Sequence, residues 1–96
     1  MLISLALDYQ SADVATRERF HVSSSRLKSL YARLSDDGVA ELGMIATCNR
    51  TELYAWCPTA VDGDLHEWHA RLARRWMRRS ADAEALLAIS ARRAGL

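Results

Sequence analysis

A single cysteine within a short polar segment is the strongest candidate for chemistry in this chain. Residues 47–54 read Thr-Cys-Asn-Arg-Thr-Glu-Leu-Tyr. A thiolate attacks an activated ester well, and a guanidinium two residues from Cys48 favours the thiolate. Arg50 can also hold a carboxylate through two parallel hydrogen bonds. Because Thr47 and Asn49 can donate hydrogen bonds to an oxygen that gains charge during the attack, the segment predicts acyl transfer to Cys48.

An inert, partly buried cysteine at a strand end is the alternative interpretation of Cys48. Whether Cys48 is catalytic or inert depends on how the neighbouring elements position it. Residues 48–50 are expected to connect two extended stretches. The expected elements are strands at 2–7, 39–47 and 51–57, and helices at 14–20, 23–34, 65–76 and 82–93. This order predicts a single α+β domain over residues 1–96. We expect a ferredoxin-like sandwich, in which helices pack on one face of an antiparallel sheet.

The composition agrees with one globular domain. Half of the 96 residues are apolar, and only one is proline. No apolar run approaches the roughly 20 residues of a membrane span, and Asp8 stops the first apolar run, which has no basic flank. We therefore expect a cytoplasmic protein without a membrane segment. Cys48 and Cys57 lie at opposite ends of an expected strand, roughly 30 Å apart at about 3.3 Å per residue, which predicts free thiols.

The net charge of +1 hides an asymmetry between two parts of the chain. Residues 1–64 carry six Lys/Arg and nine Asp/Glu, a charge of −3, whereas residues 65–96 carry seven Arg and three Asp/Glu, a charge of +4. Four arginines lie on the polar side of the third expected helix: Arg71, Arg74, Arg75 and Arg78. They form either a solvated helix face or a surface for tRNA phosphates. Trp68 and Trp76 lie on the apolar side and are expected in the core.

The Thr-Cys-Asn-Arg-Thr-Glu segment resembles the active-site segment of glutamyl-tRNA reductases, which begin tetrapyrrole (porphyrin) biosynthesis. The resemblance implies that Cys48 is a catalytic nucleophile that forms a thioester with the glutamyl group of glutamyl-tRNA. It implies substrate contacts by Thr47, Asn49 and Arg50. Residues 7–18 are also similar to the family's opening segment, with Tyr9 and Asp13 where His and Pro are usual. The similarity is strong over residues 1–58 and weaker over residues 59–96.

The resemblance further implies that NADPH reduces the thioester to glutamate-1-semialdehyde. These 96 residues contain no Gly-x-Gly-x-x-Gly turn, so we expect the NADPH-binding and dimerisation domains to be absent from them. The implied partners are glutamyl-tRNA and either a separate NADPH-binding chain or glutamate-1-semialdehyde aminomutase. A homodimer would cover the apolar last helix, with Leu86, Leu87, Ile89 and Leu96, if the sheet does not.

The alternative function is that of a stand-alone, non-catalytic relative that regulates tetrapyrrole synthesis by binding haem, tRNA or a pathway protein. A Cys-Pro dipeptide, Cys57-Pro58, is the candidate haem ligand, with His66 or His69 as the second ligand. A buried cysteine before a strand-ending proline is the other interpretation of the same dipeptide. No compact set of metal ligands is visible, and no metal site is expected.

Overall fold

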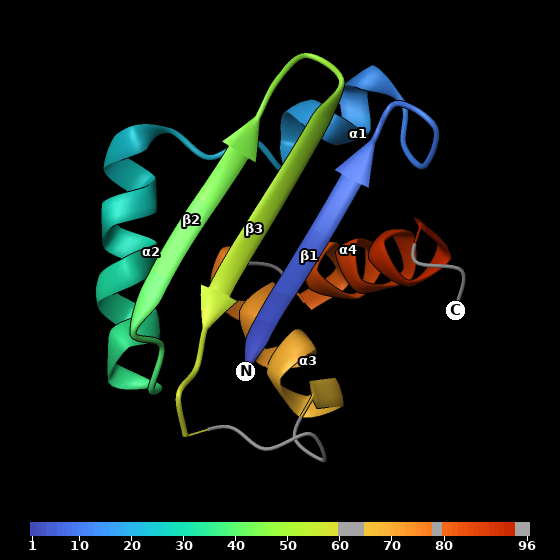
Figure 1. The fold of residues 1–96 in the computed structure, drawn as a ribbon. Coiled ribbons are helices and arrows are strands. Elements are labelled where there is room, and N and C mark those ends of the chain that lie inside the picture. The colour runs from blue at the N-terminus through green and yellow to red at the C-terminus, as the bar shows by residue number, and fades with distance from the viewer. Residues whose placement is uncertain (60–64, 78–79, 94–96) are drawn as a thin grey trace.

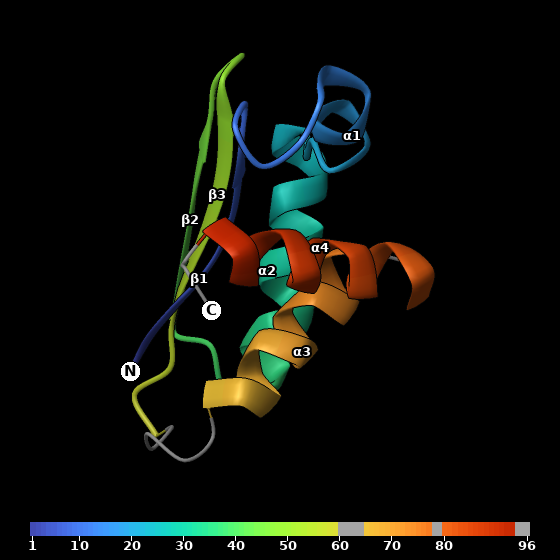
Figure 2. The ribbon, with the colours of Figure 1, turned by 90° about the vertical axis from the view of Figure 1, so that its right-hand side faces the viewer.

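Three strands form one antiparallel sheet, and the last of them along the chain lies in its middle (Figure 1). The structure, a computed structural model, describes residues 1–59, 65–77 and 80–93. Its elements in chain order are β1 (Leu2–Asp8), α1 (Val14–Arg19), α2 (Ser24–Asp36), β2 (Glu41–Ala46), β3 (Arg50–Trp56), α3 (Leu65–Trp76) and α4 (Ser80–Arg93). The helices lie on one side of the sheet (Figure 2), which confirms the predicted α+β class.

The two faces of β3 have different environments. Leu53 and Ala55 are fully buried in the core on the helix side, and Leu53 pairs with the buried Leu5 of β1. Because side chains alternate along a strand, the even-numbered positions of β3 point to the helix-free side. Trp56 is 42% exposed there. The core therefore lies between the sheet and the helices, and the opposite face of the sheet stays open.

Helix α2 begins one residue after its predicted start at 23 and ends two residues beyond its predicted end at 34. The Ser23 side chain accepts a hydrogen bond from the amide of Arg26 and thereby caps the first turn. Leu30 and Leu34 are buried. Gly38 follows the helix with a φ of 103°, a conformation that favours glycine.

Helices α3 and α4 complete the core. Trp68 and Trp76 are buried as predicted, and the Trp76 indole donates a hydrogen bond to the main-chain carbonyl of Phe20 at 3.1 Å. In α4, Leu86 and Ile89 are also buried, so this part of its apolar side faces the core. Leu87 is partly buried and Leu96 lies outside the described residues. None of the helices among the described residues is long and apolar enough to cross a membrane.

Serine hydroxyls contact the outer edge of β1. The amide of Ala6 donates to Oγ of Ser90 in α4 at 3.2 Å, and the amide of Asp8 donates to Oγ of Ser11 at 2.9 Å. Both amides point away from β3, since successive amides of a strand alternate in direction. These hydroxyls replace the main-chain carbonyls that another strand would supply.

Candidate functional site

Cys48 and Asn49 form the two-residue turn between β2 and β3. The amide of Thr47 donates to the carbonyl of Arg50 at 2.8 Å, so this pair extends the ladder. Oγ1 of Thr47 accepts hydrogen bonds from the amides of Asn49 and Arg50, both at 3.2 Å. Arg50 is therefore the first residue of β3. The prediction that it belongs to the connection between the strands was wrong. The Thr47 hydroxyl organises the turn that exposes the Cys48 thiol.

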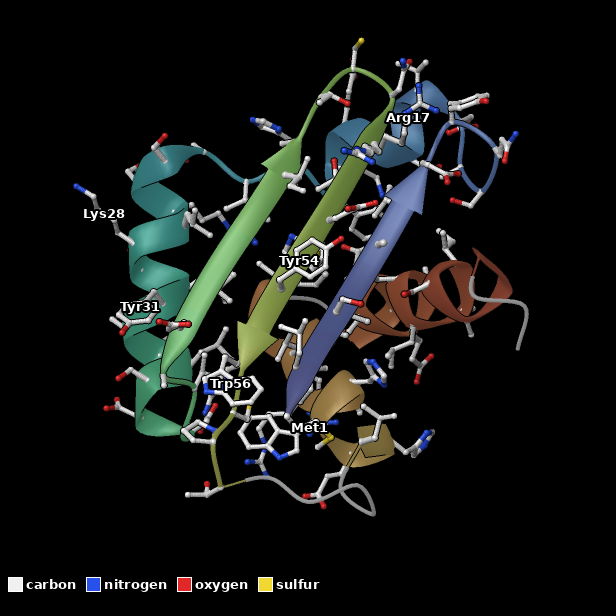
Figure 3. The ribbon with its side chains drawn as sticks, viewed as in Figure 1. Met1, Arg17, Lys28, Tyr31, Tyr54 and Trp56 are labelled. Carbon is white, nitrogen blue, oxygen red and sulfur yellow. The ribbon has the colours of Figure 1, made fainter. Side chains whose placement is uncertain are left out.

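The segment between β1 and α1 contacts this turn. The amide of Tyr9 donates to the carbonyl of Asn49 at 2.8 Å. The guanidinium of Arg17 donates to the carbonyl of Ala12 at 2.6 Å and to the carbonyl of Cys48 at 3.4 Å (Figure 3). These bonds join the two segments whose sequences resemble the reductase family. They fix the main chain around Cys48.

Asp13 occupies the position where proline is usual in the resembled family, and it caps α1. Its carboxylate accepts a hydrogen bond from the amide of Thr16 at 2.8 Å. Hydrogen bonds from Thr16 hold the pKa of Asp13 below its usual range. Aspartate at this position therefore still favours a helix start, as proline would, because both residue types suit the first positions of a helix.

A cavity of about 290 Å³ opens beside Cys48, between the hairpin turn and α1. It is lined by Val14, Arg17, Glu18, His21, Thr47, Cys48 and Thr51. Sequence reasoning did not assign Arg17, Glu18 or His21 to the site. The similarity over residues 7–18 was a signal for the first two, whereas nothing in the sequence marked His21. An imidazole and a carboxylate thus line the same cavity as the Cys48 thiol.

Arg50 lies on the helix-free side of the sheet and does not line this cavity. Its guanidinium is 3.9 Å from Oε1 of Glu52, which is only 3% exposed. The hydroxyl of Tyr54 donates to the other Glu52 oxygen at 2.5 Å. A buried carboxylate needs such partners, and Glu52 in turn orients Arg50. The guanidinium stays half exposed, so it is accessible to a second carboxylate.

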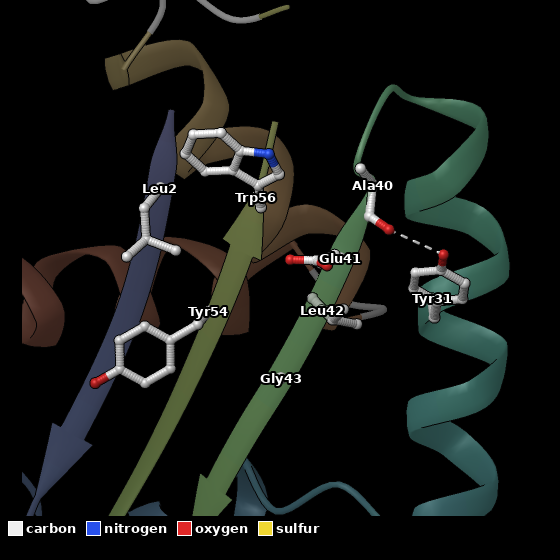
Figure 4. Close-up of a pocket in the computed structure, with 8 residues that line it drawn as sticks. All are labelled: Leu2, Tyr31, Ala40, Glu41, Leu42, Gly43, Tyr54 and Trp56. Atoms are coloured by element: carbon white, nitrogen blue, oxygen red, sulfur yellow. Dashed lines mark hydrogen bonds between the residues drawn. The ribbon is translucent and has the colours of Figure 1, made fainter. Parts of the chain in front are cut away.

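A second hollow lies at the other end of β3, away from Cys48. It measures about 570 Å³ and is lined by Leu2, Tyr31, Ala40, Glu41, Leu42, Gly43, Tyr54 and Trp56 (Figure 4). The hydroxyl of Tyr31 donates to the carbonyl of Ala40 at 3.1 Å at its rim. No residue of the Thr-Cys-Asn-Arg turn contributes to this hollow, so it is separate from the predicted chemistry.

Cys57 is fully buried, which does not favour the haem-ligand interpretation. Its amide donates to the carbonyl of Met1 at 2.9 Å, and burial raises the pKa of its thiol above the usual range. His66 is exposed. His69 is partly buried, which lowers its pKa, and it forms a hydrogen bond with the main chain of Ser4. The described residues contain no group of three His, Cys, Asp or Glu side chains that could hold a metal ion.

Alkylation should separate the two cysteines. Brief treatment of the native chain with iodoacetamide is expected to modify Cys48 and leave Cys57 unmodified, because a thiol must be accessible and ionised to react. Peptide mass mapping measures both yields in one sample, and urea-unfolded chain should show equal modification. Rapid native modification of Cys57 would contradict its burial.

The predicted arginine face of α3 is partly occupied by the chain's own acids. Arg71 is 3.1 Å from Glu67 and lies over the ring of Trp68, at 4.7 Å from its centroid. Arg75 makes two hydrogen bonds to Asp37, at 2.8 and 3.2 Å. Arg74 is exposed, and Arg78 lies outside the described residues.

Comparison with known proteins assigns the chain to a family. Residues 5–94 match the sequence profile described as "Glutamyl-tRNAGlu reductase, N-terminal domain". The chain belongs to this family. The glutamyl-tRNA reductase resemblance seen in the turn and in the N-terminal segment is thereby confirmed over nearly the whole chain.

Curated relatives agree with this assignment. The chain is 39% identical over 70 residues to a glutamyl-tRNA reductase of Saccharophagus degradans. This aligned segment covers 72% of the chain and 16% of the relative. It is 46% identical over 54 residues to a probable multifunctional siroheme biosynthesis protein of Ruminiclostridium josui, covering 55% of the chain and 10% of the relative. The chain thus spans less than a fifth of these relatives. No solved structure is significantly similar to it.

Proposed function

We propose that this glutamyl-tRNA reductase N-terminal domain performs the acyl-transfer step of the reaction. Sγ of Cys48 attacks the glutamyl carbonyl carbon of glutamyl-tRNA, and the new C–S bond replaces the ester C–O bond. The thiol proton passes to the ribose oxygen that leaves. The observation that carries the proposal is the exposed Cys48 at the rim of a cavity with His21, in a chain of this family.

The side chains around Cys48 have distinct roles in this proposal. His21 accepts the thiol proton and returns it to the leaving ribose oxygen. Arg50, oriented by Glu52, binds the γ-carboxylate of the glutamyl group. Asn49 donates a hydrogen bond to the carbonyl oxygen. Thr47 acts through the turn, since its Oγ1 already accepts two amide hydrogen bonds.

Reduction of the thioester requires NADPH, and these residues do not fit that cofactor. The described glycines are Gly38, which follows α2, and Gly43, which lies within β2. Neither belongs to a glycine-rich turn that opens a helix against a pyrophosphate. We therefore assign hydride transfer to NADPH bound outside these 96 residues, on a continuing domain or on a separate chain.

Intact-protein mass spectrometry after brief incubation with glutamyl-tRNA tests the proposal. We expect one glutamyl adduct that hydroxylamine releases, and peptide mapping should place it on Cys48. An unmodified protein with native circular dichroism would overturn the acyl-transfer proposal. Deacylated tRNA is the matched control, because it offers the same surface without the reactive ester.

Exchange of Arg50 for lysine should reduce discrimination between substrates. Lysine keeps the charge but loses the two parallel hydrogen bonds to a carboxylate. We expect the acylation rate with glutamyl-tRNA to fall about 10- to 100-fold, since charge-assisted hydrogen bonds contribute about 1.5–3 kcal/mol. The rate with glutaminyl-tRNA, which has no γ-carboxylate, should change little.

Single-turnover rates of both substrates measure this ratio. Arg19→Lys is the matched control, because Arg19 pairs with Asp82 and lies outside the cavity at Cys48. An equal loss with both substrates would instead assign Arg50 a role in the turn. Arg17→Lys then tests whether the guanidinium inside the cavity binds the carboxylate.

A further inference from the structure

The exposed side of α2 carries positive charge that the chain's own acids do not neutralise. Arg26, Lys28 and Arg33 lie on this helix, and its single acid, Asp36, is its last residue. Neither guanidinium of α2 contacts a carboxylate among the described residues. Elsewhere in the described chain, Arg19, Arg50, Arg71 and Arg75 each lie within 4 Å of one.

The two α2 arginines are held in place by main-chain carbonyls at the end of α3. Nη2 of Arg26 donates to the carbonyl of Trp76 at 2.5 Å, and Nη2 of Arg33 donates to the carbonyl of Arg75 at 3.5 Å. Each guanidinium has five N–H donors, so most remain available. Anchored guanidinium groups lose less freedom when they bind an anion.

A groove lies along this side of α2. It measures about 500 Å³ and is lined by Ser25, Arg26, Ser29, Ala32 and Arg33. Lys28 projects from the same helix away from the sheet (Figure 3). We call these five lining residues the α2 groove. Its lining has cations, hydroxyls and one methyl group and no acid, which suits phosphate groups.

The groove is also close to the proposed chemistry in the fold. Helix α2 starts at the end of the sheet where the hairpin turn with Cys48 lies (Figure 1). Two residues separate His21, in the Cys48 cavity, from the first residue of α2. The 13 residues of α2 extend about 20 Å from there, at about 1.5 Å per residue. The hollow on the helix-free face contains Glu41, so phosphate is disfavoured there.

We propose that the α2 groove binds the phosphate backbone of the tRNA whose aminoacyl end reaches Cys48. This inference rests on the proposed function and adds the RNA surface to it. Arg33 provides the test, because its replacement leaves the Arg26–Trp76 hydrogen bond intact. The partner is identified by its chemistry as a ribonucleotide backbone, and base identity plays no part.

Binding of deacylated tRNA across a salt series tests the groove. Arg33→Gln should bind about 3- to 10-fold more weakly in roughly 0.1 M salt, and the slope of log K against log salt should become shallower by about 1. Arg19→Gln removes the same charge from an ion-paired site, and we expect less than about a 2-fold change. Circular dichroism should show all three proteins folded.

The outcomes separate this inference from the proposed function. Equal losses in Arg33→Gln and Arg19→Gln, or no measurable tRNA binding by the wild-type chain, would overturn the groove. A Cys48 adduct in the wild type together with equal losses would overturn the groove alone. Groove-dependent binding without any Cys48 adduct would support the groove and overturn the acyl-transfer proposal.

Discussion

Exchange of Cys48 for serine is expected to abolish the glutamyl adduct. A serine hydroxyl is ionised far less than a thiol at neutral pH, and the cavity offers it no base stronger than the side chains of Glu18 and His21. We expect the rate of adduct formation to fall by about 10⁴-fold or more, the scale seen when catalytic nucleophiles are replaced. Mass spectra at equal times and tRNA concentrations measure the loss.

Cys57→Ser is the matched control, because it removes the other thiol of the chain. It should retain the adduct at the wild-type rate, provided that the buried substitution leaves the fold intact. An adduct that disappears with Cys57 and persists without Cys48 would reverse the assignment. tRNA binding should be unchanged by Cys48→Ser, since the α2 groove lies on another element.

Exchange of Trp76 for alanine is expected to cause the largest loss of stability. The indole is 1% exposed and lies among the helices of the core. Truncation of a buried tryptophan costs about 3–5 kcal/mol, which is a large share of the about 5–15 kcal/mol that stabilises a domain. Urea unfolding followed by circular dichroism should show the shift of the midpoint.

Trp76→Phe isolates the hydrogen bond from the packing. Phenylalanine fills much of the same space but leaves the carbonyl of Phe20 without its donor, so a loss of about 1–3 kcal/mol is expected. Phe20 lies between α1, which carries the cavity residue Arg17, and the cavity residue His21. If Trp76→Phe also slows acylation of Cys48, the bond positions α1; an unchanged rate confines its role to stability.

Local patterns predicted most of the fold. Ser23 and the leucines that follow it at helical spacing marked α2, and the structure confirms the cap and the buried positions Leu30 and Leu34. The strands were predicted within a few residues. Arg50 was misplaced because its entry into β3 depends on pairing with Asp8 of β1, a contact between residues far apart in the sequence.

The candidate site was only partly predictable for the same reason. The turn was found from its residue types, whereas the wall formed by Glu18 and His21 depends on how α1 packs against the hairpin. The pairing of Arg75 with Asp37 joins α3 to the end of α2 across 38 residues. The burial of Glu52 likewise depends on its neighbours in the sheet, which a strand pattern does not reveal.

The serines at the edge of β1 affect how this sheet can associate with other chains. An edge strand with unpaired amides is a template for strand addition and aggregation. Here the amides of Ala6 and Asp8 are already bound by Ser90 and Ser11, so an incoming strand must first displace two hydroxyls. The edge therefore resists accidental self-association without a proline at these two positions. The edge of β1 can still pair with a strand whose main-chain carbonyls replace the two serine hydroxyls.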